Sequence, residues 1–262
     1  MRPFLVLLAL SIALFAEEVK LENLRFVDSV YGLPKKEASV VPGERLVLLF
    51  DAKGMKREGV WVAFKLGTDL LDSTGQSVLS WEGDETRVAD LFGGASHSDA
   101  VCINFADTVP LGSYKMKVTF EDTKSRETAS ALLPIAVIAP RLSIINAGLS
   151  SDADGVQSHG RSLVEQEAVH VVFGVAGLKV ADGKAKLQED LQILDESGAS
   201  IGWQPNAVDA EIPMQRAVAS VFNRLVMTRA GKYTVKIVVR DMNADGAKAE
   251  YAFPIEVVAP PR

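Results

Sequence analysis

The sequence predicts an all-β fold made of two tandem antiparallel β-sandwich domains that are related by an internal repeat. Three observations support this fold class. Apolar and polar residues alternate along many short segments, as they do in half-buried strands. Gly, Asp, Asn and Ser cluster between these segments, as they do in turns. The same order of segments occurs twice, and no long stretch shows the periodicity of an amphipathic helix.

Residues 1–16 are typical of a secretory signal peptide. Arg2 precedes an apolar run from Phe4 to Ala16 in which Ser11 is the single polar residue. A helix of this length would span only about 20 Å, which is less than the hydrocarbon core of about 30 Å. We therefore expect cleavage after Ala16 and export of the mature chain. The alternative is an uncleaved membrane anchor.

Composition narrows the classes of function. The chain carries 28 basic and 34 acidic residues, and its formal net charge of −6 disfavours nucleic-acid binding, because phosphates require a dense basic surface. A single cysteine excludes an intramolecular disulfide. The mature part of the sequence holds no transmembrane segment, since no second apolar run is long enough. We expect an exported bacterial protein, located in a periplasm or outside the cell.

Matched segments in the two halves carry the repeat. Each half contains an early apolar strand, a short glycine-containing segment, an acidic turn, an alternating strand that begins with Gly-x-Tyr, and a closing proline-bounded segment. The matched pairs are Leu46–Phe50 with Val169–Phe173, Gly54–Lys56 with Gly177–Lys179, Leu71–Gly75 with Leu194–Gly198, Gly112–Asp122 with Gly231–Asp241, and Pro134–Pro140 with Pro254–Pro260.

The repeat divides the mature chain into two predicted domains, residues 17–140 and 141–262. Only a short segment around Pro140 separates them, so we expect a semi-rigid elbow rather than a flexible linker. Pro134 and Pro254 lie within the last strand of each copy. Because proline lacks an N–H group, these positions are expected at a sheet edge or a bulge.

Two tyrosines make the prediction more specific. Tyr114 and Tyr233 each follow a glycine at the start of an alternating strand, as in the tyrosine corner of an immunoglobulin-like sandwich. Met116 and Val235 stand where antibody domains place a cysteine, so packing should replace the disulfide. Trp61 is interpreted as the inward tryptophan of the third strand. On these residues the mature chain resembles the immunoglobulin-like, fibronectin-III-like and macroglobulin-like modules of bacterial secreted proteins.

The sequence offers few residues for catalysis, and no enzyme, cofactor or zinc site is predicted. Cys102 lies in an apolar strand and is interpreted as a small core residue rather than a reactive thiol. His97 and His159 lie in loops of different repeat copies, and His170 should point away from its core. No nucleophile elbow, phosphate-binding loop or zinc-protease motif is present in the sequence.

Calcium is the metal for which the sequence gives the stronger hint. The segment Asp241–Gly246 matches the first positions of an EF-hand loop, but Ala252 occupies the position of the bidentate glutamate. A second, shorter acidic turn spans Ser151–Gly155. Turns rich in Asp, Asn and Gly bend the chain without an ion, so we interpret both segments as turns.

Trp81 and Trp203 are the candidate ligand-binding residues. Both follow the middle turn of their repeat copy, and exposed aromatic side chains at this place would form platforms for carbohydrate. Their positions relative to the turn differ by one residue, which places them on opposite sheet faces unless a bulge intervenes. The competing interpretation is that both indoles pack beneath the connection that follows the turn.

The sequence therefore favours a non-catalytic protein that presents two sandwich domains to a macromolecular partner, either a protein or a component of the cell envelope. A carbohydrate-binding or small-ligand-binding module is the alternative. A third class, the two-domain periplasmic chaperone that lends a strand to a subunit, is less favoured because such proteins lack so clear a repeat. None of these hypotheses requires a cofactor.

Overall fold

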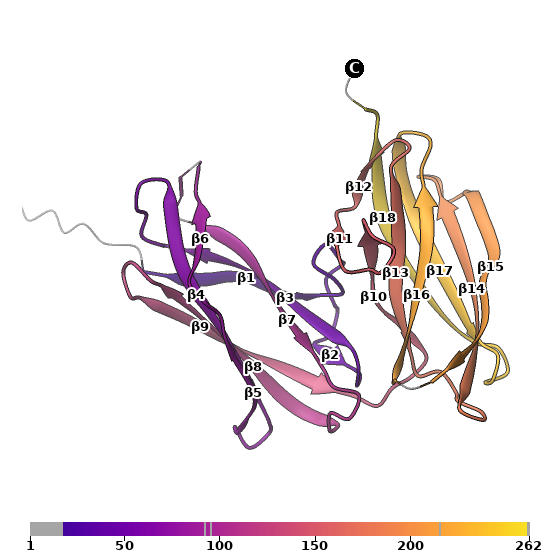
Figure 1. Ribbon diagram of the computed structural model, residues 1–262, viewed down its shortest axis with the longest axis horizontal. Helices are drawn as coiled ribbons and strands as arrows, with labels where there is room; N and C mark the ends of the chain where they lie inside the picture. The colour runs from indigo at the N-terminus through magenta and orange to yellow at the C-terminus, as the bar shows by residue number, and fades with distance from the viewer. Residues whose placement is uncertain (1–17, 92, 95, 215, 261–262) are drawn as a thin grey trace, which may run out of the picture.

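The computed structural model describes residues 18–91, 93–94, 96–214 and 216–260, and these residues form two antiparallel β-sandwiches (Figure 1). The predicted signal peptide, residues 1–16, lies outside the described residues. The fold class predicted from the alternation is confirmed, because the described chain is built of strands. No helix in the described ranges is long and apolar enough to cross a membrane.

The first sandwich packs a sheet of order β1-β3-β7 against a sheet of order β2-β9-β8-β4-β5, in which β6 also pairs with β4. All neighbours are antiparallel except β2 and β9, which are parallel. Its strands are β1 (Lys20–Val27), β2 (Ser39–Val40), β3 (Arg45–Lys53), β4 (Trp61–Leu71), β5 (Ser77–Glu82), β6 (Thr86–Ala89), β7 (His97–Asn104), β8 (Gly112–Asp122) and β9 (Thr128–Val137).

The second sandwich repeats this order, with one additional short strand, β11, beside β10. A sheet β11-β10-β13-β16 packs against a sheet β12-β18-β17-β14-β15. One long strand, β15, takes the place of β5 and β6. The strands are β10 (Ser143–Ser150), β11 (Ser158–His159), β12 (Ser162–Val164), β13 (Ala168–Ala176), β14 (Lys184–Leu194), β15 (Ser200–Pro213), β16 (Val218–Val226), β17 (Gly231–Asp241) and β18 (Ala247–Val258).

Both predicted tyrosine corners are present, which identifies the sandwiches as immunoglobulin-like. The Tyr114 hydroxyl donates to the carbonyl oxygen of Pro110 at 2.9 Å, and the Tyr233 hydroxyl donates to that of Arg229 at 3.0 Å. Met116 and Val235 are fully buried, so packing does fill the place of the antibody disulfide. In the first core, the rings of Phe64 and Phe120 stack with centroids 4.8 Å apart.

The interpretation of Trp61 as an inward residue is wrong. Trp61 is 41% exposed at the start of β4, where the guanidinium of Arg87 lies 5.1 Å from the ring centroid. The inward positions of β4 begin one residue later with Val62, because successive side chains of a strand point to opposite faces.

The two prolines lie in the strand next to the short edge strand of each sheet, at positions that this edge strand leaves unpaired. Pro134 lies in β9, whose outer neighbour β2 pairs only with Ala136 and Val137. Pro254 lies in β18, whose outer neighbour β12 begins its pairing at Glu256. Neither proline therefore removes a hydrogen bond that a neighbouring strand needs.

Each sandwich contains a buried aspartate that joins two loops. Asp122, at the end of β8, accepts hydrogen bonds from the main-chain N–H groups of Lys56 at 2.7 Å and Lys124 at 2.9 Å. Asp241, at the end of β17, accepts one from the main chain of Lys179 at 2.6 Å. In each copy, these contacts join the aspartate to the glycine-containing segment of the repeat. Asp122 meets the segment Gly54–Lys56, and Asp241 meets the segment Gly177–Lys179.

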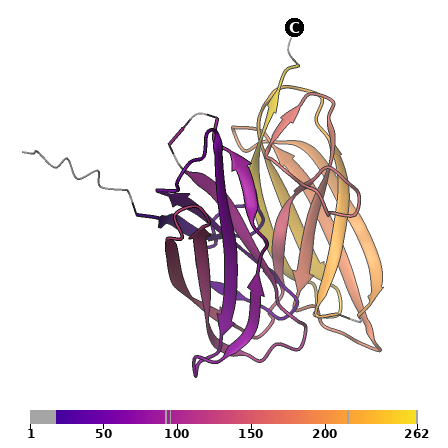
Figure 2. The ribbon, with the colours of Figure 1, turned by 60° about the vertical axis from the view of Figure 1, so that its left-hand side comes forward.

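Direct contacts connect the two sandwiches, which lie side by side in both views (Figures 1 and 2). The Asn146 side-chain amide donates to the carbonyl oxygens of Arg45 at 2.7 Å and Asp28 at 3.1 Å. The Tyr251 hydroxyl donates to the Asp28 carboxylate at 2.6 Å. A small separate apolar core contains Val41, Ile145 and Ala176. Together with Pro140, these contacts oppose a free swing of one sandwich against the other.

Removal of the buried carboxylate in Asp241→Ala should lower the free energy of unfolding of the second sandwich by about 2–4 kcal/mol, because buried main-chain N–H groups lose their acceptor. Urea unfolding of both proteins measures the change. Asp84→Ala, at an exposed loop position, is the control and should change stability by less than about 0.5 kcal/mol. Equal stability of the Asp241 variant and the wild type would contradict the structural role of this residue.

Candidate functional site: an apolar groove in the first sandwich

The candidate site lies where the two sheets of the first sandwich end. Strands β5 and β7 are the last strands of their sheets, and each pairs with a neighbour on one side only within the described chain. Main-chain N–H and C=O groups on the outer side of such strands are free to pair with another strand.

Two adjoining hollows lie between these strand edges and form one groove, which we call the β5–β7 groove. The larger hollow has a volume of about 570 Å³ and the smaller one about 190 Å³. They share Leu79 of β5 and Ile103 of β7, so they adjoin along both strands. The groove is built mainly of apolar side chains, including Leu66, Val78, Trp81, Val101, Phe105 and Leu111.

The β5 side of the groove exposes large apolar side chains that face the interior of the sandwich. Leu79 pairs across the sheet with the buried Leu70, and Trp81 pairs with the buried Thr68, so all four side chains point to the same face. Leu79 is nevertheless 44% exposed and Trp81 53% exposed. The sandwich therefore leaves part of its apolar inner face uncovered at this edge.

The wall of the smaller hollow contains an unsatisfied hydroxyl group. Thr68 is buried, and its Oγ1 has no hydrogen-bond partner in the part of the chain that the structure describes. A buried hydroxyl without a partner costs free energy comparable to a lost hydrogen bond. The Thr68 Oγ1 is itself covered from solvent, so it lies behind the apolar wall and not on its surface.

The corresponding edge of the second sandwich is closed. β15 runs along the whole of β14, and side chains from it and from the residue that follows it pack against the core. The register of β15 shifts between Glu189 and Leu191 of its partner strand, and β15 contains Pro205 and Pro213. Bulges and prolines are devices that prevent pairing of an edge strand with another chain. The packing side chains are Ala207, Val208, Ile212 and Met214.

In the second sandwich a polar pair, a buried glutamate and a half-buried asparagine, replaces an apolar pair of the first. Leu66 and Val101, which line the groove, match Glu189 and Asn223 in the strand pairings of the repeat. The Asn223 amide donates to the two carboxylate oxygens of Glu189 at 2.8 and 2.9 Å. Burial raises the pKa of Glu189 to about 7, while the Asn223 hydrogen bonds oppose this shift and the charge of Asp190 adds to it.

The two candidate tryptophans lie on opposite sheet faces, as their one-residue offset predicted. Trp81 faces the groove, whereas Trp203 pairs with Gln192 and points to the outer face of its sheet. Trp203 is 62% exposed, so the interpretation that both indoles are packed beneath the connection is wrong. β5 and β15 are edge strands, and nothing in the described chain covers these two positions fully. Their role in ligand binding stays a prediction.

Cys102 is not a core residue, which corrects the sequence interpretation. It alternates with the buried Val101 and Ile103 in β7, so its side chain points outward, and it lies at the rim of the β5–β7 groove. Burial by neighbouring groups raises the pKa of the thiol, an effect that Asp99 increases and Arg45 reduces.

The histidines and acidic turns do not form a shared site. His97 contacts Asp99, and His159 contacts Glu167 in the other sandwich. Among the described residues, no group of three His, Cys, Asp or Glu side chains converges as metal ligands would. The Asp152 carboxylate accepts main-chain hydrogen bonds from Val156 and Gln157 in the second acidic turn, and Asp241 accepts one from Asn243 in the first, which is the chemistry of a turn.

Sequence reasoning missed Val78, Leu79 and Thr68. A signal for them was present, because Leu79 and Trp81 are two residues apart and therefore share a face of a strand. A glycine-containing segment also follows this strand after a short interval, so the strand must be short. The corresponding strand of the second copy is long.

No family model matches the chain, and no curated protein matches it. Among solved structures, the C-terminal domain of the Streptococcus agalactiae antigen I/II polypeptide BspA is 12% identical, with a TM-score of 0.30, over 92% of this chain and 99% of that one. The C-terminal domain of Streptococcus pyogenes AspA is 10% identical, with a TM-score of 0.30, over 92% and 99%. Red sea bream transglutaminase is 10% identical, with a TM-score of 0.30, over 94% of this chain and 32% of its own. The chain thus spans about a third of the transglutaminase, and similarities of this size carry no functional information.

The raised pKa of Cys102 should be visible in its alkylation rate. Iodoacetamide reacts with the thiolate, so the reaction of the folded protein at pH 8 should be slower than that of the urea-unfolded chain. The midpoint of the rate against pH should also lie above the value of about 8.5 for an unperturbed thiol. Because the chain has one cysteine, mass spectrometry of the intact protein suffices. Identical midpoints in the folded and unfolded states would contradict this assignment.

Glu189 should make the second sandwich less stable as the pH rises. Its pKa in the folded state, about 7, exceeds the ordinary value of 4.5, so the folded state binds more protons between these values. The free energy of unfolding should therefore fall by about 2 kcal/mol from pH 5 to pH 8 through this residue. Glu189→Gln removes the titrating group. In this variant, urea unfolding at pH 5 and pH 8 should show a smaller fall in the free energy of unfolding than in the wild type. An unchanged pH dependence in this variant would refute the assignment.

Proposed function

We propose that this chain is an exported, non-catalytic interaction protein. In this proposal a signal peptide, residues 1–16, directs export, and two immunoglobulin-like domains, residues 17–140 and 141–262, are presented in a periplasm or outside the cell. The β5–β7 groove binds an extended apolar segment of a partner polypeptide. The observation that carries the proposal is the open apolar groove between two unpaired strand edges.

The main chain of β7 supports binding by strand addition. Its inner side is paired with β3 along the whole length from His97 to Asn104, without a register shift, which holds the strand in place. Its outer side has no partner strand in the described chain. An extended peptide could add to this side as a further strand, and the main-chain hydrogen bonds would provide affinity without regard to sequence.

The side chains of the groove support selectivity for apolar residues. Side chains of an added strand alternate in direction, so every second one would enter the hollows beside Leu79 and Trp81. The walls carry little charge, and the one carboxylate there, Asp72, already accepts hydrogen bonds from its own turn. A segment with alternating apolar residues meets these requirements.

The difference between the two sandwiches supports a functional origin for the groove. The second sandwich shows that this fold can close the same edge with a long, bulged strand that contains proline. β5 has neither a proline nor a cover, although an exposed apolar edge strand favours unwanted association. Retention of such an edge in one copy is explained if a partner covers it.

A library of displayed random peptides of about twelve residues tests this proposal, with the purified mature chain as bait. Enriched peptides should carry apolar residues at alternate positions, because only one face of an added strand enters the groove. Leu79→Glu should weaken their binding at least about tenfold, as measured by fluorescence anisotropy of a labelled peptide, because it places a charge in the apolar wall.

Ile201→Glu provides the matched control. Ile201 is an exposed apolar residue on β15, the strand that corresponds to β5, so this variant should retain binding within about twofold. Failure of the library to enrich any peptide, or equal losses in the two variants, would refute the groove as the binding site.

A further inference from the structure

The outer face of the larger sheet in the second sandwich carries an exposed tryptophan in polar surroundings. The strand pairings place Trp203, Gln192, Lys236 and Ala252 in one row across β15, β14, β17 and β18. The indole is more than half exposed, and its neighbour in the row, Gln192, makes no side-chain hydrogen bond within the described residues. A large apolar ring thus lies beside free hydrogen-bonding groups.

A shallow hollow of about 820 Å³ continues from this row along the sheet. The next row contains Leu194, Thr234 and Pro254, and all three line the hollow. Side chains two positions apart on one face of a strand lie about 7 Å from each other, so the tryptophan row borders the hollow directly. The surface formed by Trp203, Gln192 and the hollow is called the Trp203 face below.

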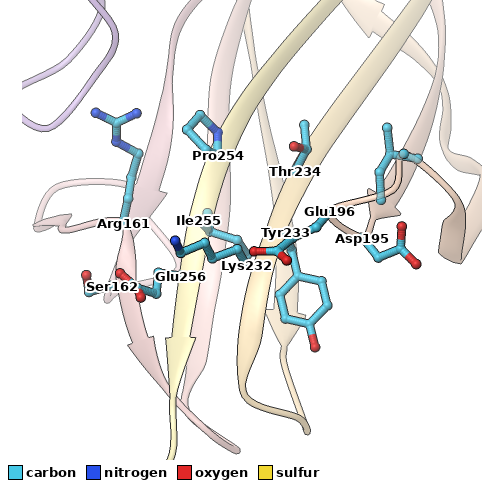
Figure 3. A pocket seen from close by; sticks show the side chains of 12 residues that line it. Arg161, Ser162, Asp195, Glu196, Lys232, Tyr233, Thr234, Pro254, Ile255 and Glu256 are labelled. Carbon is cyan, nitrogen blue, oxygen red and sulfur yellow. The ribbon is translucent and has the colours of Figure 1, made fainter.

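The charged residues around the hollow are mixed in sign. Figure 3 shows Arg161 with Ser162 at one side and Asp195 with Glu196 at the other, while Lys232 projects between them. This balance does not favour a polyanion or a polycation. Donors and acceptors occur together, which suits a ligand with many hydroxyl groups, since a hydroxyl both donates and accepts.

We propose that the Trp203 face binds an oligosaccharide of β-linked pyranose rings. One apolar ring face would stack on the indole of Trp203, and the next sugar units would extend over the hollow, with hydroxyl groups bound by Gln192, Thr234 and Lys232. An extended β-linked chain fits because the strand register places the tryptophan row next to the row that lines the hollow, so the two together span several strands. This inference is independent of the peptide-binding proposal, because the two surfaces lie on different sandwiches.

Isothermal titration calorimetry of the mature chain with cellohexaose and with chitohexaose tests the inference. We expect binding of at least one hexaose, and Trp203→Ala should weaken it at least about tenfold because the stacking surface is lost. Lys232→Ala should weaken it by a few-fold. Trp81→Ala is the matched control, since it removes the exposed tryptophan of the other sandwich and should change the affinity by less than about twofold.

Two kinds of result would overturn this inference. One is the absence of wild-type binding to both hexaoses. The other is a hexaose affinity that does not depend on Trp203. The Trp203 variant would then bind as tightly as the wild type, or the Trp81 variant would lose affinity in its place. Urea unfolding of each variant identifies any loss that is due to misfolding, which is not expected because both side chains are largely exposed. Peptide binding to the β5–β7 groove should be unaffected in Trp203→Ala, so failure of one proposal is distinguishable from failure of the other.

Discussion

A buried carboxylate at the end of one strand holds each sandwich together at its loop end. Asp122 and Asp241 are almost completely buried, and each accepts main-chain hydrogen bonds both from its own turn and from a loop distant in sequence. Because a buried charge must be satisfied by such bonds, the two loops have little freedom to move apart. The tyrosine corner fixes the other end of the same strand. With both ends fixed, the central strands keep the same arrangement in the two copies.

The two copies diverge at the sheet edges, where this constraint does not act. The second copy covers its edge with a long bulged strand and places the pair Glu189 and Asn223 inside. The first copy keeps the apolar residues Leu66 and Val101 at the matching positions and leaves them beside an open groove. Burial of a carboxylate costs free energy, so Glu189 lowers the stability of the second sandwich at neutral pH. The apolar residues at the matching positions of the first sandwich carry no such cost. The same scaffold thus provides one edge suited to association and one protected from it.

Much of the fold could be predicted from the sequence, because the segments that recur in both copies include residues that contact each other in space. The glycine-containing segments and the aspartates that were matched between the copies lie next to each other in space. The tyrosine corners followed from their position after a glycine at the start of a strand. These features are local or are repeated, so one sequence contains enough information to find them.

The edges could not be predicted in the same way. Alternation shows which residues share a face, but the exposure of Trp81 and Leu79 depends on whether a strand from elsewhere in the chain covers them. Cys102 was assigned to the core because apolar residues surround it in sequence, whereas its phase in the strand directs it outward. The unsatisfied hydroxyl of Thr68 likewise depends on its surroundings in space. Residues at a sheet edge are therefore the ones for which a pattern gives the least information.

Hydrogen exchange can determine whether the open edge of β7 accepts an added strand. Amide exchange of the mature chain should be compared with and without a saturating peptide selected by the groove. If the peptide adds as a strand, those amides of β7 that do not bond to β3 should exchange at least about tenfold more slowly, while amides of β16 at the matching edge of the second sandwich should not change. Unchanged exchange along β7 in the presence of a tightly bound peptide would rule out strand addition at this edge.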